Sequence, residues 1–281
     1  MPVLTLDYRH CGRMRPSYLK HREVGAIALQ ARQQLVDAGT DAIPLTVLSA
    51  VSGLKINRIA FELFVSTQEA VHDEVGNPVL GICEYDPGVP DTAMVSVSPV
   101  GENASEELVL STLAHETGHA IFDAPGWIVD ACKGPGLFDD PREPTRAAYR
   151  TTTRDGEHLA RAVPANGMEP SPGPGVTIGS DEYFAELRAN EFMGSLLVPR
   201  ERLLAAVEEL AIPYRITLHR GPSLDPASPG TGLTLSAGGD LGDVYMDLFQ
   251  RALATRFGVS PRFIRVRLQR YGLLNAGPAL A

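Results

Sequence analysis

The sequence predicts an α+β fold, in which two helices and a small sheet precede two longer helices and a C-terminal helical pair. Residues 23–38 carry apolar side chains at the spacing of one helix face. Residues 79–85 and 93–97 are short apolar runs bounded by turn residues, which is typical of strands. Residues 106–122 and 181–198 are long runs with acidic first turns, which is typical of helices.

The N-terminal part of the chain has weaker signals. Residues 1–22 are rich in histidine, arginine and tyrosine without a clear period, so we expect a loose arm there. After the helix at 23–38, a second and shorter helix is expected over 43–53, begun by a proline. Residues 56–65 and 68–75 fit either a strand or a helix. The sheet is therefore expected chiefly from the strands that follow.

The most informative segment is His-Glu-Thr-Gly-His at residues 115–119. In a helix, His115 and His119 are one turn apart and project from the same face. Two neutral imidazoles at this spacing can bind one zinc ion and leave positions for a third ligand and a water. Glu116 lies about 100° round the helix, where it can reach that water and act as a base. Chance alone produces H-E-x-x-H in roughly 1% of chains of this composition. The residues around the motif must therefore show whether it is a metal site or a coincidence.

The surroundings of this motif favour a buried helix. Asn103 or Ser105 can cap it, and Glu106 and Glu107 follow in the first turn, where the helix dipole favours acids. The motif residues lie on two neighbouring stripes that are otherwise almost entirely apolar. Buried imidazoles and carboxylates require a partner, and a metal ion is a suitable one. Gly118 within the helix indicates that another backbone passes close by.

A third ligand is expected on a second helix, over residues 180–199. Glu186 and Asn190 lie one turn apart at the edge of its apolar stripe. This placement fits Glu186 as a zinc ligand and Asn190 as a residue that orients a ligand. Two solvated polar side chains are the alternative, and Glu182 and Glu191 remain alternative ligands.

Three segments in this order resemble the ImmA/IrrE family of zinc metallopeptidases. Residues 113–120 contain the H-E-x-x-H motif in its helix. Residues 186–199 match the family's E-x-x-A-N-x-F pattern with a following leucine pair and proline. Residues 253–274 look like the segment that commonly follows in such proteins. The resemblance spans roughly residues 24–274, with long interruptions.

This resemblance implies His115, His119 and Glu186 as the zinc ligands and Glu116 as the general base. Arg188 stands where many members of the family have a second acid, which favours Glu186 as the ligand. The resemblance also implies a zincin-like metallopeptidase core, with a small sheet beside the active-site helices. The predicted order of elements agrees with such a core.

In zincin-like folds, an edge strand beside the zinc helix commonly receives an extended peptide, and Met94–Ser98 is the candidate here. An ordinary internal strand is the alternative. The metallopeptidase domain is expected over residues 23–220, with an insertion at about 123–179 that either covers the active site or forms a mobile surface segment. Residues 145–162 within it could form an arginine-bearing helix, with His158 on it.

Residues 221–243 are rich in glycine, proline and serine and are expected to be a linker before a helical unit at 244–281. Residues 244–257 and 260–271, separated by a Gly-Val turn, have the lengths of a helix-turn-helix pair. The pair is rich in arginine, which suits DNA binding, and in apolar residues, which suit docking or substrate recognition. The arginines are Arg251, Arg256, Arg262, Arg265, Arg267 and Arg270.

The composition of the 281 residues agrees with a cytoplasmic enzyme. A net charge of −9 argues against a broad nucleic-acid-binding surface. No apolar run approaches the roughly 18–20 residues that span a bilayer, and the chain start lacks the pattern of a signal peptide. The three cysteines, Cys11, Cys83 and Cys132, are widely separated and are expected to be reduced thiols.

Taken with the resemblance, these features predict a zinc-dependent endopeptidase. The resemblance implies that its substrate is a specific helix-turn-helix repressor or regulatory protein, in stress response or mobile-element control. His219, Tyr183 and His158 are candidate donors to the oxyanion that forms during peptide hydrolysis. The alternative is a non-catalytic, zinc-containing regulator that binds DNA or a repressor through its arginine-rich C-terminal helices.

Overall fold

The computed structural model divides into two compact units, each described here by itself. The first unit contains residues 1–153 and 179–196, and the second contains the described residues from Leu197 onward. The structure describes residues 2–73, 76–101, 104–132, 180–222 and 231–274, and the backbone of residues 146–150.

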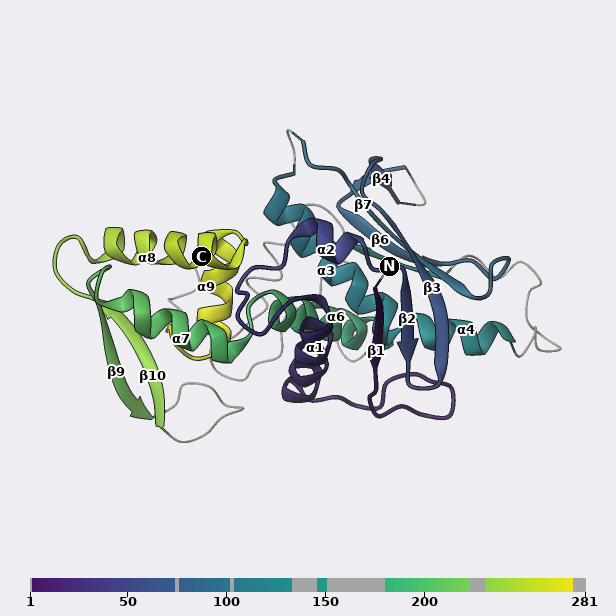
Figure 1. Cartoon of the computed structure of the whole chain (residues 1–281), viewed down its shortest axis with the longest axis horizontal. Coiled ribbons are helices and arrows are strands. Elements are labelled where there is room, and N and C mark those ends of the chain that lie inside the picture. Colours follow the sequence, from purple (N-terminus) through teal and green to yellow (C-terminus); the bar gives the residue numbers. More distant parts are fainter. Residues whose placement is uncertain are drawn as a thin grey trace. The chain divides into compact units, whose positions relative to one another are not determined.

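The first unit is built on a mixed six-stranded sheet, shown in Figure 1. Its strands lie in the order β1 (Val3–Leu6), β2 (Gly53–Ile56), β3 (Ile59–Ser66), β7 (Thr92–Val97), β6 (Gly81–Tyr85) and β8 (Arg146–Arg150). The pairs β1–β2 and β3–β7 are parallel, and the other neighbours are antiparallel. A separate two-stranded pair is formed by β4 (Val71–His72) and β5 (Pro78–Val79). The expected α+β class is confirmed.

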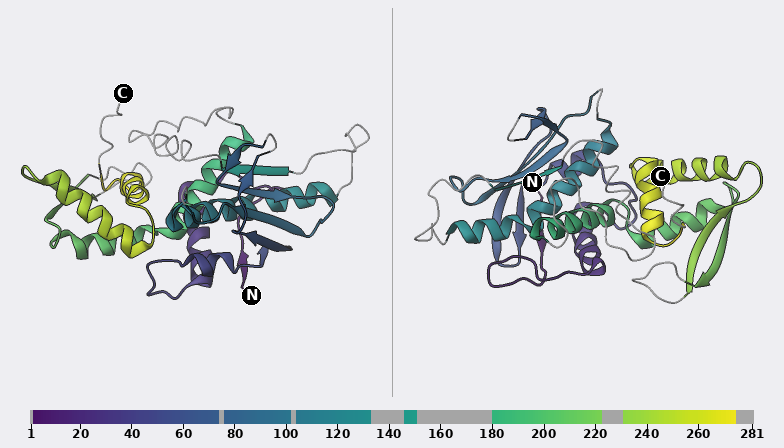
Figure 2. Two further views of the ribbon diagram at one scale, coloured as in Figure 1. Left: turned by 90° about the horizontal axis from the view of Figure 1, so that it is seen from above. Right: turned by 180° about the vertical axis from the view of Figure 1, so that it is seen from behind.

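Helices of the first unit cover the sheet and bear the motif residues. They are α1 (His21–Leu35), α2 (Leu45–Ser49), α3 (Glu106–Phe122), α4 (Ala124–Cys132) and, apart from its last residue, α6 (Asp181–Leu197). Helix α3 packs on β6 and β7, where Ala93, Val95 and Val97 alternate toward the interior. This alternation gives β7 one face for the helix. In Figure 2, α6 lies alongside α3.

The N-terminal residues are not the loose arm that was expected over 1–22. Strand β1 adds a parallel edge to the sheet and buries Leu4 and Leu6. Beyond it, the Tyr8 hydroxyl donates to the backbone oxygen of Ile121 at 2.8 Å. The alternation of β1 covers only four residues, which is too short to identify a strand before its partner is known.

Two further expectations in this unit are corrected, and for Met94–Ser98 the structure selects the internal strand of the two alternatives. The short helix ends at Ser49 rather than 53, because Gly53 begins strand β2. Strand β7, which includes most of Met94–Ser98, lies between β3 and β6 and is therefore not an edge strand. Residues 146–150 pair with β6 as strand β8 instead of beginning a helix. Long-range pairing decided each of these cases.

The expected insertion also differs at its start. Residues 124–132, which fall within the expected insertion at 123–179, form helix α4 directly after α3. Its Ala124 and Ile128 are buried. The rest of that insertion, apart from the backbone of β8, lies outside the described residues.

The second unit contains α7 (Arg200–Ala211), β9 (Ile216–Pro222), β10 (Thr231–Ala237), α8 (Gly242–Phe257) and α9 (Pro261–Arg270). The expected linker over 221–243 is wrong, because β10 pairs with β9 in an antiparallel hairpin. The helical pair agrees closely with expectation: Gly258 ends α8 in the left-handed conformation, and the Ser260 side chain caps α9 by accepting from the Phe263 amide.

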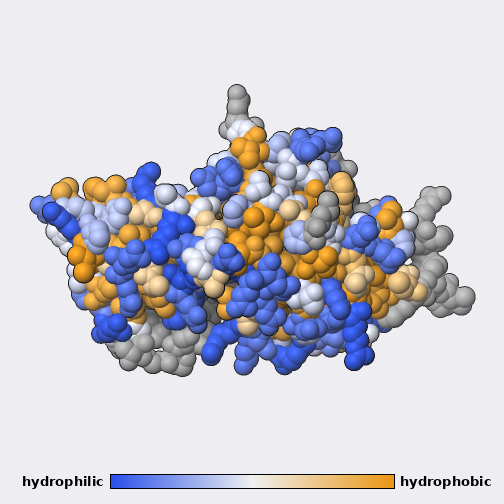
Figure 3. Space-filling view, in the orientation of Figure 1, coloured by the Kyte–Doolittle hydropathy of each residue, from blue (hydrophilic) through white to orange (hydrophobic). Residues whose placement is uncertain are grey.

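Among the described residues, no helix combines the length and apolar character that crossing a bilayer requires. Figure 3 shows that hydrophobic and hydrophilic residues both reach the surface on the face in view. On β3 and β7, the register partners Phe64 and Met94 are both exposed. Cys11, Cys83 and Cys132 are free, in agreement with the expected reduced thiols.

Candidate metal centre

Helix α3 carries the histidine motif into the interior of the first unit. Ser105 is its N-cap and accepts a hydrogen bond from the Leu108 amide, which selects Ser105 from the two expected caps. From Val109 to Phe122 every residue of the helix is buried. His115, Glu116 and His119 are at most 1% exposed. Three ionisable side chains are therefore enclosed in the core, where each requires compensation.

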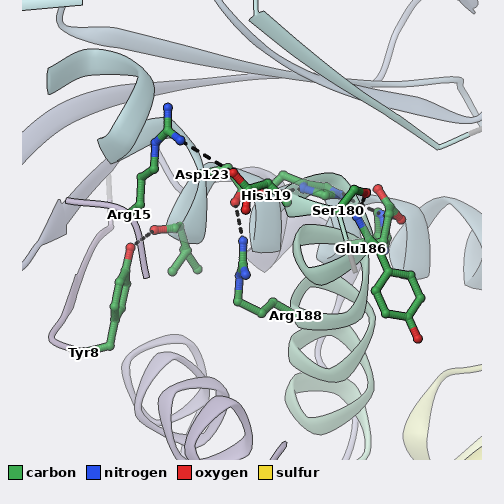
Figure 4. Close-up of polar contacts among 11 residues, drawn as sticks. Tyr8, Arg15, His119, Asp123, Ser180, Glu186 and Arg188 are labelled. Atoms are coloured by element: carbon green, nitrogen blue, oxygen red, sulfur yellow. Dashed lines mark hydrogen bonds and ion pairs between the residues drawn. The ribbon is translucent and has the colours of Figure 1, made fainter. Parts of the chain in front are cut away.

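Helix α6 brings the third group to the two histidines. Its first turn is capped by Ser180, which accepts from the Tyr183 amide at 3.1 Å. Further along, α6 approaches α3 so closely that a Cβ atom at Gly118 would lie 3.0 Å from Cα of Ala189. The expected close approach at Gly118 is thus confirmed. This approach places the Glu186 carboxylate against the Nε2 atoms of both imidazoles, and Figure 4 shows it beside His119.

The Nε2 atoms of the two histidines and the carboxylate of Glu186 converge. The Nε2 atoms of His115 and His119 are 3.2 Å apart. One carboxylate oxygen of Glu186 lies 3.1 Å from Nε2 of His119, and the other lies 3.4 Å from Nε2 of His115. Ligands at about 2.0–2.1 Å from a tetrahedral zinc ion are about 3.3 Å apart. The three groups therefore form a set that could hold a metal ion.

The charges of this group are strongly coupled. Burial lowers the pKa of His119, but the carboxylates of Glu186 and Asp123 outweigh it and raise this pKa well above its usual value. Burial raises the pKa of Glu186, but the two imidazoles outweigh it and hold this pKa well below its usual range. This group of side chains therefore favours a bound positive charge, whether a proton or a metal cation.

Metal binding is consequently expected to weaken as the pH falls. His119 must lose a proton to become a ligand, and its raised pKa makes the proton an effective competitor near neutrality. Lowering the pH from about 8 to about 6 should reduce zinc affinity by roughly tenfold per unit, since one proton is released. Chelator competition at several pH values measures this slope. An affinity that stays constant over the range would contradict the assignment of His119.

A second layer of polar contacts orients His119. Its Nδ1 lies 2.8 Å from Oδ2 of Asp123, and because a carboxylate accepts, the neutral imidazole keeps its single proton on Nδ1, which leaves the lone pair of Nε2 for a metal. Arg188 donates to the other oxygen of Asp123 at 2.9 Å. Burial, with Asp123 nearby, raises the pKa of Tyr8, whose hydroxyl is thus kept as a donor. The role of Asp123 was missed, although an acid four residues after His119 on one helix is a visible signal.

Glu116 lies between α3 and strand β6. A Cβ atom at Gly81 of β6 would lie 2.6 Å from Cγ2 of Thr112, 3.1 Å from Cγ of Glu116 and 3.3 Å from its Oε1. The glutamate is fully buried. Its carboxylate also contributes to raising the pKa of the buried Cys83 thiol, after the larger effect of burial. Gly81 is therefore the strand residue that makes room for Glu116.

Substitution of Gly81 by alanine is expected to destabilise the protein by about 1–3 kcal/mol, because the new methyl group overlaps a stiff, buried threonine. Gly53→Ala is the matched control in the same sheet, since a Cβ there would lie 3.4 Å from Val3, which is ordinary contact. Its effect should stay within about 0.5 kcal/mol. Urea unfolding measures the free energy of unfolding of both variants. Equal values would show that strand β6 can shift to admit the methyl group without loss of stability.

The other side chains expected near the site are placed differently. Glu182 is exposed, and Glu191 is buried and accepts from the Ser195 hydroxyl at 2.8 Å, so neither joins the ligand group. The expected contact between Asn190 and a ligand is not found, since neither amide atom has a hydrogen-bond partner among the described residues.

The three candidate oxyanion donors are scattered. Tyr183 is buried on α6, with its ring 5.5 Å from that of Phe184. His219 belongs to the second unit, where its Nε2 lies 2.7 Å from the Ser236 hydroxyl. His158 lies outside the described residues.

Comparison of the chain with models of protein families, with curated proteins and with solved structures finds no match in any of the three.

Proposed function

We propose that this chain is a zinc-dependent metallo-endopeptidase that cleaves a specific regulatory protein. The observation that carries the proposal is the convergence of His115, His119 and Glu186 from two helices, with the buried Glu116 between the two histidines in sequence. A purely structural metal site has no use for a buried glutamate beside its ligands. A hydrolytic site requires such a base.

The choice of zinc rests on the donor set. Two imidazole nitrogens and one carboxylate oxygen are typical ligands of catalytic zinc, which keeps a fourth position for water or substrate. A closed structural site would instead contribute four protein ligands. Among the described residues, the group has three.

The chain's own residues have defined roles in this mechanism. His115, His119 and Glu186 would hold the metal, and Asp123 keeps the proton of His119 on Nδ1. When bound, zinc supplies a Lewis acid that polarises a carbonyl and lowers the pKa of water toward about 7. Glu116 accepts the proton of the attacking water and delivers it to the leaving amine, so that one carboxylate serves both proton transfers.

The proposed substrate class is a helix-turn-helix transcriptional repressor. The resemblance of residues 113–120 and 186–199 to ImmA/IrrE metallopeptidases supports this choice. Contacts in the second unit make direct DNA binding less favourable: Arg251 pairs with Asp247 at 2.7 Å, and Arg256 pairs with Glu209 at 2.6 Å. Arg267 is only 5% exposed. Several arginines of the α8–α9 pair are thus engaged within the unit.

The test is incubation of the zinc-loaded full chain with the repressor encoded beside its gene, with and without a chelator. Mass spectrometry should show a small number of discrete fragments, formed only without chelator. An intact repressor under both conditions would overturn the proposed substrate. Digestion of unrelated unfolded proteins at many positions would instead indicate a general peptidase. A salt-dependent gel shift with promoter DNA, without cleavage, would favour the regulator.

A further inference from the structure

Both carboxylate oxygens of Asp123 are used, each by a different partner. Oδ2 lies 2.8 Å from Nδ1 of His119, and Oδ1 accepts from Arg188 at 2.9 Å. Asp123 is 11% exposed and Arg188 17% exposed, measured on their side chains. The chain His119–Asp123–Arg188 therefore runs from the ligand group outward through a largely buried set of hydrogen bonds, as Figure 4 shows.

Asp123 occupies an unfavourable position by itself. It is the C-cap residue of α3, where the helix dipole presents its negative end and disfavours an acid. The Glu186 carboxylate adds further negative charge on the opposite side of His119. The guanidinium of Arg188, 2.9 Å from Oδ1 of Asp123, offsets this accumulation of negative charge.

Arg188 also comes from the helix that supplies the ligand. Helix α6 meets α3 through three nearby residues: Glu186 at the imidazoles, Arg188 at Asp123, and Ala189 at Gly118. The same helix–helix contact thus places Glu186 beside Nε2 of His119. It also places Arg188 beside Asp123, the carboxylate that contacts Nδ1 of His119. Movement of α6 would alter both together.

We propose that Arg188 is a positioning residue for the metal centre, acting on His119 through Asp123. The guanidinium holds the Asp123 carboxylate in the one orientation that accepts from Nδ1 of His119. This contact keeps Nε2 turned toward Glu186 and His115. The proposal rests on the proposed metal site, and it adds Arg188 as the residue that orients the ligand His119 through Asp123.

An ordinary salt bridge between helices makes a different prediction. It would contribute a small stabilisation and leave metal binding unchanged. Loss of an outer partner of a ligating histidine instead lowers metal affinity by about 10- to 100-fold. Zinc affinity, measured by chelator competition, therefore separates the two roles, and the visible spectrum of bound Co²⁺ reports the ligand geometry independently of any enzymatic activity.

The experiment compares Arg188→Met, Asp123→Asn and the double variant in the full chain. Each single variant should lose about 10- to 100-fold in zinc affinity and show an altered Co²⁺ spectrum. Because Arg188 acts through Asp123, the double variant should lose no more than Asp123→Asn alone. Arg15→Met is the matched control: Arg15 pairs with Asp130 at 2.8 Å, and neither residue belongs to the ligand group or to the His119–Asp123–Arg188 chain. It should bind zinc as the parent chain does.

Several outcomes would overturn the proposal. Unchanged zinc affinity in Arg188→Met would show that the contact is an ordinary salt bridge. The same conclusion would follow if the fold-losses in affinity of the two single variants multiplied in the double variant. Should Arg188→Met not fold, Arg188→Lys replaces it, since an ammonium lacks the planar fork and should lower the affinity only while Asp123 is present. A parent chain that binds zinc but cleaves nothing refutes the peptidase and leaves this proposal intact. A parent chain without zinc affinity refutes both.

Discussion

Glu116→Gln is expected to lower the rate of repressor cleavage by about 10²- to 10⁴-fold while zinc remains bound, because the amide cannot accept a proton. Glutamine has nearly the shape of glutamate, so the packing against Gly81 and Thr112 is retained. The three ligand atoms do not include Glu116. Removal of a fully buried carboxylate should leave the fold at least as stable.

Zinc content and cleavage have to be measured on the same preparation. Glu106→Gln is the matched control, because Glu106 lies in the first turn of the same helix and is exposed. The control should cleave at the parental rate. Full activity of Glu116→Gln would refute the role of Glu116 as the base, and loss of zinc from this variant would show instead that Glu116 supports the ligand group.

Glu186→Gln is expected to lower zinc affinity by more than about 100-fold, which exceeds the loss caused by removing an outer partner of a ligand. The neutral amide is a weaker ligand than the carboxylate, and it leaves only His115 and His119 in the described group. Cleavage should be lost in parallel at limiting zinc. Glu182→Gln, one turn earlier on the same helix and exposed, is the control and should bind zinc normally.

The pH dependence adds an independent readout for this variant. The Glu186 carboxylate is the largest of the effects that raise the pKa of His119. Without this carboxylate the proton on His119 is held less tightly, so competition between proton and zinc decreases near neutrality. The affinity of Glu186→Gln should therefore vary less with pH than that of the parent chain. An unchanged slope would show that another group supplies the competing proton.

Local signals in the sequence predicted the two helices of the site well. Ser105, one of the two expected caps of the first helix, accepts an amide hydrogen bond, and Ser180 caps the second helix just before its acidic first turn. The spacing of His115 and His119 placed both on one helix face, and Gly118 correctly indicated a close neighbour. Each of these features depends on residues within a few positions of one another, which is the range over which helix geometry is determined.

Pairing between distant segments was harder to predict. Strand β1 joins the sheet through residues fifty positions away, and β8 joins β6 across an even longer separation. Strand β10 falls within the expected linker at 221–243, because the glycine and serine residues of that segment also suit loops. A short strand can be recognised only when its partner strand is known, since both strands contribute to the hydrogen bonding and burial that stabilise it.

The sequence by itself determined the ligand types, the helix that carries two of them and the fold class. Tertiary structure decided which of the acids at 182, 186 and 191 meets the histidines, and it paired Asp123 with Arg188. The reason is physical: side-chain spacing along one helix follows from its 3.6-residue turn, whereas the meeting of two helices depends on how closely their backbones approach. At this site, that approach occurs at Gly118 and Ala189.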